Sequence, residues 1–321
     1  MAKSQQSKKT ADKVPTAATS SQPRKLKKPV YKSFRLQKAI KPDQKLPSAF
    51  RLLRQAVGIM KANWKVFVGI ALIYGVLNVA LVQGVSAASN LGEAKKSLDQ
   101  VFNGNFGSLA SAGTLFIYLL GSAGSNVNPT AGAYQFILAI VTSLALIWAI
   151  RQLYSGVKVR VRDGFYQGMY PLVPFLLVLL VVALQCVPVL IGAYLYNLVV
   201  TNGIAVSVVE HVLWGVMLFL TAVLSLYMVC SSAFALYIVS LPDMTPKRAL
   251  LSARQLVRYR RWTVVRKVVF LPVVLLVVAA VIIIPLILFA TPVAPWVLVL
   301  VSMGLLPIIH SYLYTLYRAL L

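Results

Sequence analysis

The sequence has few charged residues, and this scarcity indicates the class of protein. Only 12% of the 321 residues are Asp, Glu, Lys or Arg, about half the share of an ordinary soluble protein, whereas 59% are hydrophobic. A soluble fold of this length has too little interior to bury so much apolar surface, but a lipid bilayer accepts it. We therefore predict an all-α fold, a polytopic membrane helical bundle.

Acidic residues are scarcer still, which leaves little material for a catalytic site. The chain has seven Asp and Glu, and those beyond residue 46 are Glu93, Asp99, Asp163, Glu210 and Asp243. Their positions suggest no pair for acid–base chemistry, and no group of His, Cys, Asp and Glu has the spacing of metal ligands. We expect no catalytic residue, no cofactor and no metal, and predict that the protein is not an enzyme.

Cysteine is rare as well. Cys186 and Cys230 each lie within an apolar run, so a disulfide framework is excluded and both are interpreted as small buried hydrophobic residues. The first 46 residues contain no apolar core of a secretory signal. They are rich in Lys, Ser, Gln, Thr, Ala and Pro, and we predict a disordered basic tail over residues 1–46.

Six apolar segments are long enough to cross a membrane. A helix needs about 17–25 apolar residues to span about 30 Å of hydrocarbon. The predicted spans, within a membrane domain at residues 47–321, are 66–87, 133–151, 171–199, 212–241, 268–290 and 295–317. Between the first two lies a long loop, 88–132, whose apolar stretch at 115–120 is too short to span. An interfacial helix is favoured there over a re-entrant segment.

The connecting segments alternate between basic and non-basic. More than half of the 32 Lys and Arg residues stand between residue 1 and Lys65. Further clusters lie in the second and fourth connections, at 151–165 and 241–267, whereas the other three connections have no basic excess. Because such an excess marks the cytoplasmic side, we predict a multi-pass protein of a prokaryotic inner membrane with both termini in the cytoplasm.

A basic amphipathic helix is predicted just before the first span, with Ser48 as its cap. Its apolar residues recur every three or four positions, which places them on one helical face. They are Phe50, Leu53, Val57, Met60 and Trp64, and the basic residues off that face are Arg51, Arg54 and Lys61.

A second such helix is predicted before the fifth span. Thr245 is placed to cap it, and Pro246 suits the first helical position. Its apolar stripe is Leu250, Ala253 and Val257, and its charges are Arg248, Arg254, Arg258, Arg260 and Arg261. In each of the two helices a tryptophan, Trp64 or Trp262, is predicted to close the helix just before the span.

Both helices are expected to lie in the headgroup plane, with apolar residues in the acyl boundary and cations on anionic phosphates. Tryptophan prefers that depth. The predicted anionic-lipid surface is Arg51, Arg54, Lys61, Trp64, Arg248, Arg254, Arg258, Arg260, Arg261 and Trp262. A shorter aromatic segment, GFYQGMYPLVP at 164–174, precedes the third span, so three hairpins are predicted, each with a helix or segment leading into it.

The segments AFRLLRQAVGIMKANW (49–64) and ALLSARQLVRYRRW (249–262), together with the six-helix layout, resemble a group of prokaryotic membrane proteins. The group includes the YciC-like proteins and the membrane domain attached to some glycerophosphodiester phosphodiesterases. The resemblance covers residues 47–318, and the soluble phosphodiesterase barrel with its metal-binding carboxylates has no counterpart. It implies an architecture and no particular activity.

Three ionisable residues are candidates for an intramembrane polar site: Glu210, His211 and His310. Glu210 and His211 either cap the fourth span, which is favoured, or form a proton-linked group at its outer mouth. His310 lies within the sixth span, where an ionisable group is a functional hypothesis by default, although Ser311 and Tyr312 offer polar partners. Prolines within three spans either expose backbone, as in transporters, or are accommodated by neighbouring helices.

Three functions remain open. The favoured one is a non-enzymatic protein that organises or senses lipid, or supports envelope transport, through a basic cytoplasmic face. Its partners are then the lipid bilayer and anionic phospholipid headgroups. A small-solute transporter or permease is the alternative, and an intramembrane lipid-modifying enzyme is least favoured. The tail is expected to touch anionic lipid, with ribosomal or other RNA, or an acidic protein, as alternative partners.

Overall fold

The described part of the chain consists of helices and the turns between them. The computed structural model describes residues 46–82, 96, 129–205, 207–241, 244–290 and 293–321, which belong to one unit, Gln44–Leu321. These residues contain no strand, so the predicted all-α class is confirmed. Residues 1–45 of the predicted tail, and the apolar stretch at 115–120, lie outside them.

Six of the helices are long and apolar enough to cross a membrane, as the sequence predicts. They range from 19 residues, about 28 Å, to 30 residues, about 45 Å. They are α2 (Trp64–Val82), α5 (Pro129–Tyr154), α7 (Leu172–Thr201), α8 (Val208–Ser232), α11 (Arg261–Phe289) and α12 (Ala294–Leu320). The chain therefore has the architecture of a multi-pass membrane protein.

Large apolar side chains cover the outer surface of these helices. Leu184 on α7 and Phe219 on α8, for example, are both more than 60% exposed. Soluble proteins rarely expose continuous apolar surface of this kind, because its contact with water is unfavourable. The exposed faces of the six helices are thus suited to lipid.

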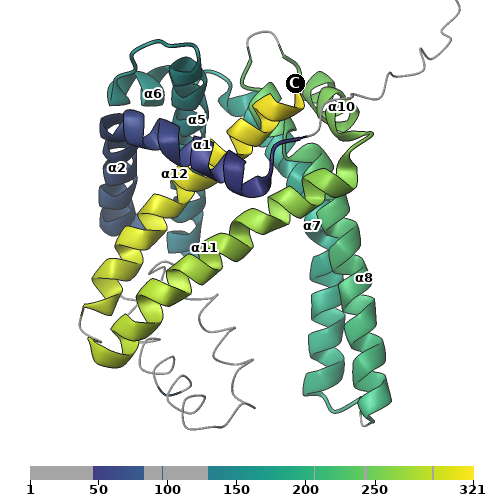
Figure 1. Ribbon diagram of the computed structural model, residues 1–321. Helices are drawn as coiled ribbons and strands as arrows, with labels where there is room; N and C mark the ends of the chain where they lie inside the picture. The colour runs from purple at the N-terminus through teal and green to yellow at the C-terminus, as the bar shows by residue number, and fades with distance from the viewer. Residues whose placement is uncertain (1–45, 83–95, 97–128, 206, 242–243, 291–292) are drawn as a thin grey trace, which may run out of the picture. The chain divides into compact units, whose positions relative to one another are not determined.

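The long helices pack as three hairpins, α2 with α5, α7 with α8, and α11 with α12 (Figure 1). In each hairpin the first helix begins, and the second ends, at the same end of the bundle. We call it the basic end, because the exposed cations of residues 51–61 and 248–258 lie there. Packing of consecutive spans against each other is the usual arrangement in helical proteins, and it confirms the predicted grouping of the spans into three hairpins.

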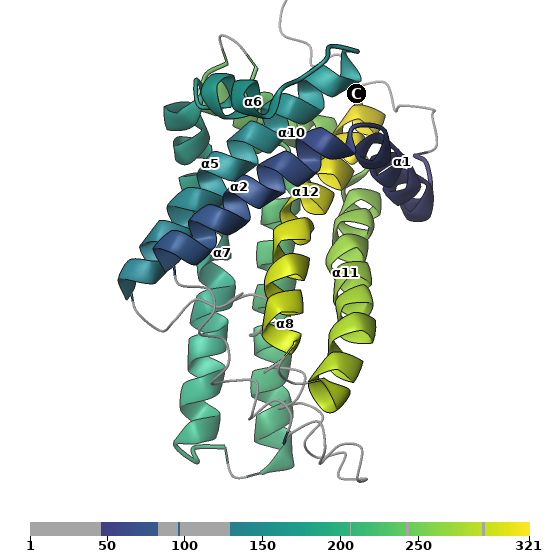
Figure 2. The same ribbon diagram turned by 90° about the vertical axis from the view of Figure 1, so that its left-hand side faces the viewer.

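Short helices lie at the basic end, and one precedes each hairpin. These leading helices are α1 (Ala49–Ala62), α6 (Val161–Gly168) and α10 (Pro246–Val257). Each packs on the hairpin before it, taken in cyclic order: α6 on α5, α10 on α8 and on α9 (Ala235–Ile238), and α1 on α12 (Figure 2). The leading helices therefore link the three hairpins into a ring.

Pairs of residues four positions apart attach the leading helices. The pairs are Leu52 and Ala56 on α1, Gly164 and Gly168 on α6, and Ala249 and Ala253 on α10, and all six residues are buried. Residues four apart lie on the same helical face, and small ones let two helix backbones approach closely. The local pattern that attaches these helices is thus one of small residues, with Leu52 as the exception.

Two of the predicted boundaries are wrong. Span five begins at Arg261, seven residues before the predicted 268, because a helix continues through charged residues at its end as long as they reach water or polar partners. Span four begins at Val208, four residues before the predicted 212, and runs to Ile238, with only a short irregularity at 233–234 that separates α8 from α9.

The predicted place of the two tryptophans is also wrong. Helix α1 ends at Ala62, where the Asn63 amide side chain donates to the Ile59 carbonyl at 3.3 Å, and Trp64 begins α2. Likewise α10 ends at Val257, and Trp262 lies in the first turn of α11. The chain turns before each tryptophan, so both start the span and neither closes the leading helix.

Candidate functional site

The cations of the two basic leading helices point away from the bundle. Arg51, Arg54 and Lys61 on α1 are exposed. Arg248 and Arg254 on α10, and Arg258 directly after it, are exposed as well. The outer surfaces of α1 and α10 at the basic end therefore carry exposed cations.

The buried face of α1 is not the predicted one. Its buried residues are Leu52 and Ala56, whereas Phe50 is 70% exposed and the other predicted stripe residues on α1 are half-buried. Leu52 and Ala56 each precede a predicted stripe residue by one position, so the most buried face is rotated about the helix axis by about 100° from the predicted one. The cause of this rotation is the small side chain of Ala56, which lets α1 pack on α12, while the larger apolar residues remain at the rim. The Phe50 ring meets Phe270 edge-on, with centroids 4.8 Å apart.

The predicted stripe of α10 is largely confirmed. Ala253 and Val257 are buried together with Ala249, and Leu250 is half-buried. Helix α10 packs against α8, α9 and α7 with this face. On both basic leading helices the most buried residues thus contact protein, so the cations stand on helices docked to the bundle.

The other residues of the predicted lipid surface have different surroundings. Trp64 and Trp262 are 58% and 73% exposed at the starts of α2 and α11. Arg261 is half-buried, donates to the Tyr227 hydroxyl and stands 5.1 Å from the centroid of that ring. Arg260 is half-buried too. Arg261 therefore ties α11 to α8, and it belongs to the fold more than to the exposed surface.

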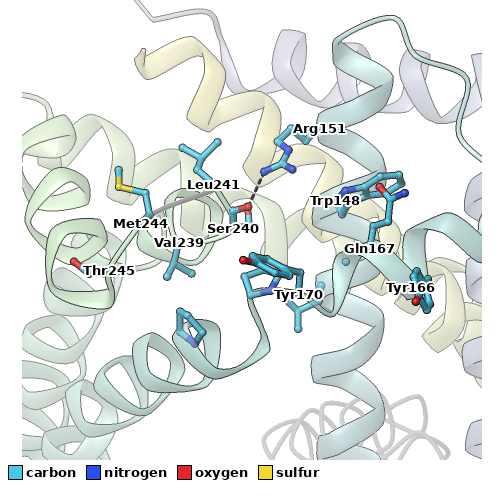
Figure 3. A pocket seen from close by; sticks show the side chains of 14 residues that line it. Trp148, Arg151, Tyr166, Gln167, Tyr170, Val239, Ser240, Leu241, Met244 and Thr245 are labelled. Carbon is cyan, nitrogen blue, oxygen red and sulfur yellow. Dashed lines mark hydrogen bonds between the residues drawn. The ribbon is translucent and has the colours of Figure 1, made fainter.

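A cavity of about 800 Å³ lies at the basic end, between α5, the α6–α7 corner and the α9–α10 connection (Figure 3). We call it the α5–α10 cavity. The Arg151 guanidinium reaches from α5 into this region and donates from Nη1 to the Ser240 carbonyl at 2.6 Å. The residues that line the α5–α10 cavity are Leu144, Trp148, Arg151, Tyr166, Gln167, Gly168, Tyr170, Pro171, Pro174, Val239, Ser240, Leu241, Met244 and Thr245.

The close approach of α6 to α5 shapes one wall of this cavity. A Cβ on Gly168 would lie 3.0 Å from the Leu144 carbonyl oxygen and from the Ala145 Cα, so a larger residue cannot take this place without a shift of backbone. At Gly164 the nearest atom, the Ala145 carbonyl oxygen, would be 3.5 Å away, an ordinary contact. The sequence carries this signal as the spacing Gly-x-x-x-Gly within GFYQG, although by itself it does not identify the partner helix.

A second cavity, of about 630 Å³, lies between the ends of α1, α5 and α12. Tyr154 and Thr315 share a hydrogen bond of 2.7 Å there, and the Arg318 guanidinium stands 4.4 Å from the centroid of the Tyr154 ring. A third, apolar groove of about 430 Å³ runs between α11 and α12 and is lined by Leu271, Leu275 and Ile309 among others. Its lining is almost entirely apolar.

The structure separates the residues of the predicted intramembrane polar site. Glu210 and His211 lie in the first turn of α8, at the end opposite to the basic end, where Ser207 and Glu210 form a capping box. The His211 Nδ1 is 2.9 Å from the Ser207 carbonyl oxygen. The arrangement is that of a polar helix cap, the reading that the sequence favours.

His310 lies elsewhere, on α12, within a cluster of aromatic side chains from α9 and α12. Its Nδ1 is 3.1 Å from the Tyr237 hydroxyl, and Tyr314 and Tyr317 pack on the ring of that tyrosine. Among the described residues no group of three or more His, Cys, Asp or Glu could hold a metal ion. His310 is thus not joined with Glu210 and His211 in one site.

Comparisons of the chain with protein-family models, with curated proteins and with solved structures find no match. The resemblance to the YciC-like group therefore stays a prediction.

Proposed function

We propose that this multi-pass protein binds anionic phospholipid headgroups with its basic end, at the cytoplasmic face of a prokaryotic inner membrane, and so organises or senses lipid or supports envelope transport. The observation that carries the proposal is the docking of α1 and α10. Their small residues contact protein, and their arginines and lysines are exposed beside the tryptophans that begin two spans. In this proposal the protein has no enzymatic activity.

Docking has an energetic consequence for lipid binding. A free amphipathic helix loses conformational entropy when it settles on a membrane. Helices α1 and α10 are already ordered by their contacts with α12 and with α8 and α9. Each cation near an anionic surface adds about 1 kcal/mol of attraction at moderate ionic strength. The six exposed cations are thus presented by helices that are already in place before lipid binds.

The charge distribution supports the proposed side of the membrane. The described basic clusters lie at one end of the bundle, and an excess of Lys and Arg is retained on the cytoplasmic side. The cytoplasmic leaflet is also the one that attracts basic segments through its anionic lipids. The orientation and the lipid partner therefore support each other, and both termini are assigned to the cytoplasm.

A small-solute transporter or permease is the second candidate, and the α5–α10 cavity favours it. Its volume of about 800 Å³ lies within the usual range of ligand pockets, about 300–1,000 Å³. The cavity lies at the basic end, however, and the three ionisable candidates of the spans are not gathered in one polar site. The lipid role therefore has the better support.

Lipid selectivity tests the proposal. The full chain is reconstituted in phosphatidylcholine bilayers with trace spin-labelled phosphatidylglycerol or phosphatidylcholine, and the fraction of motionally restricted label gives the relative association constant. Replacing Arg248, Arg254 and Arg258 by Gln should lower the preference for phosphatidylglycerol about threefold or more, since each cation contributes about 1 kcal/mol at most.

The matched control keeps the charge. Replacing the same three arginines by Lys should leave the preference close to that of the native chain, and raising the salt concentration should reduce it in both proteins. An unchanged preference in the Gln variant would contradict the proposal.

A further inference from the structure

One cation at the basic end differs from the exposed ones in its position. Arg151 is half-buried, lines the α5–α10 cavity and is the one charged residue among the described residues that do so. A guanidinium has five N–H donors in a planar fork, and within the described residues the guanidinium of Arg151 donates a single hydrogen bond, to the Ser240 carbonyl. The donors that remain are suited to an anion with several oxygens.

The lining of the cavity combines polar and apolar parts. Arg151, Gln167 and Thr245 offer hydrogen-bond donors from three different segments of the chain, and Trp148 and Tyr170 supply aromatic surface (Figure 3). Leu144 and Pro174 add an apolar wall, and they belong to the spanning helices α5 and α7. A ligand with an anionic head and an apolar extension would match this lining.

We propose that the α5–α10 cavity binds one phosphate-bearing headgroup, with Arg151 contacting the phosphate, Gln167 and Thr245 donating to its polar groups, and Trp148 and Tyr170 beside its apolar part. The proposal rests on the proposed lipid-binding function and names a single site within the same end. Phosphate could come from a membrane phospholipid or from a soluble phosphate ester. The apolar wall along α5 and α7 favours the phospholipid.

The position of the cavity predicts a consequence of occupancy. Its walls come from hairpin one through α5, from the α6–α7 corner of hairpin two, and from the connection that leads to hairpin three. A ligand that contacts all three walls stabilises the folded bundle, because it binds the native state and not the unfolded one. Binding can therefore be followed both directly and through the temperature of unfolding.

The experiment uses the full chain in a non-ionic detergent, with dihexanoyl phosphatidylglycerol, dihexanoyl phosphatidylcholine and glycerol 3-phosphate as probes. Native mass spectrometry counts bound molecules, and thermal unfolding is measured over a concentration series of each probe. We expect saturable one-to-one binding of dihexanoyl phosphatidylglycerol with a rise in unfolding temperature, and weaker binding of glycerol 3-phosphate.

Two variants act on the cavity in different ways. Arg151→Gln removes the charge, and Thr245→Phe fills space while Arg151 stays in place. Thr245 suits this purpose because it is exposed and its side chain makes no capping hydrogen bond to α10. Each variant should weaken binding at least tenfold. The control Arg162→Gln removes an equal charge from an exposed position on α6 and should leave the affinity unchanged.

The outcomes separate this site from the surface described above. Equal or tighter binding of glycerol 3-phosphate, lost in both variants, would support the phosphate site and assign it to a soluble ester. Absence of one-to-one binding, or binding that both variants retain, would overturn the site. The Gln variant of Arg248, Arg254 and Arg258 should keep the one-to-one binding even though its general selectivity falls, so the two proposals can fail independently.

Discussion

Helices α1 and α10 have similar sequences, yet different parts of the bundle hold them. Helix α1 packs on α12 of hairpin three, where Lys267 donates to the Pro47 carbonyl just before the helix. Helix α10 packs on α8 and α9 of hairpin two. Each leads into one hairpin and is attached to the one before it. The comparison shows that a shared local pattern produces the same kind of attachment at two different places.

The largest effect is expected where the largest group is added at a buried position of a leading helix. Ala56→Leu on α1 and Ala253→Leu on α10 each add bulk at a side chain that is at most 1% exposed. Overpacking of this kind costs about 1–3 kcal/mol. The free energy of unfolding, measured by titration of mixed micelles with dodecyl sulfate, should fall by that amount in each variant. If the free energy of unfolding falls in only one of the two variants, α1 and α10 are not attached to the bundle in equivalent ways.

A matched control on α1 keeps the chemistry of this change. Ala62→Leu makes the same substitution at the last residue of the helix, where the side chain is exposed. Its effect on the free energy of unfolding should stay within about 0.5 kcal/mol, as for most surface substitutions. A loss as large as that of Ala56→Leu would show that the substitution acts through something other than packing against the bundle.

A smaller effect is expected on the third leading helix, α6. Gly168→Ala places a Cβ 3.0 Å from backbone atoms of α5 and should destabilise the protein by about 1 kcal/mol, as moderate overpacking does. Gly164→Ala meets its nearest atom at 3.5 Å and removes a helix-unfavourable glycine. It should be neutral or slightly stabilising in the same titration. Equal effects of the two variants would show that α6 does not depend on close approach at Gly168.

Much of the fold follows from local patterns in the sequence. Long apolar runs predict the number of spans, and the cap at Ser48 and the start at Pro246 follow from residue preferences at helix ends. The predicted grouping of the spans into hairpins is also found. The spans and the helix ends depend on residues that are close together in the chain, and the hairpins pair spans that are consecutive in it.

The attachment of α1 could not be predicted in the same way, because it depends on distant residues. Periodicity ranks the large residues Phe50 and Met60 as the apolar face, whereas the contact with α12 is decided by the space that Ala56 leaves. Hydropathy carries little information about such small residues. The buried face of a short helix therefore requires knowledge of the surface that it meets.

The position of Arg151 in a cavity could not be predicted from the sequence for a related reason. In the sequence it is one basic residue in a connection between two spans, similar to Lys158 and Arg162. In the structure α5 continues to Tyr154, so Arg151 lies on a helix and reaches Ser240, which is distant in the chain. The charge pattern correctly placed Arg151 at the same end of the bundle as the other basic clusters. The cavity, however, is formed only by the tertiary contacts of three segments, which the charge pattern does not show.

The central claim, that the basic end faces the cytoplasm, can be measured directly by labelling of single cysteines. Cys186 and Cys230 are replaced by Ser and Ala, and a cysteine is introduced either at exposed Ser155, at the basic end, or at exposed Ile204, at the opposite end. A membrane-impermeant maleimide is then added to intact spheroplasts. The account predicts labelling at position 204 in intact spheroplasts and at position 155 only after permeabilisation. The reverse pattern would contradict it.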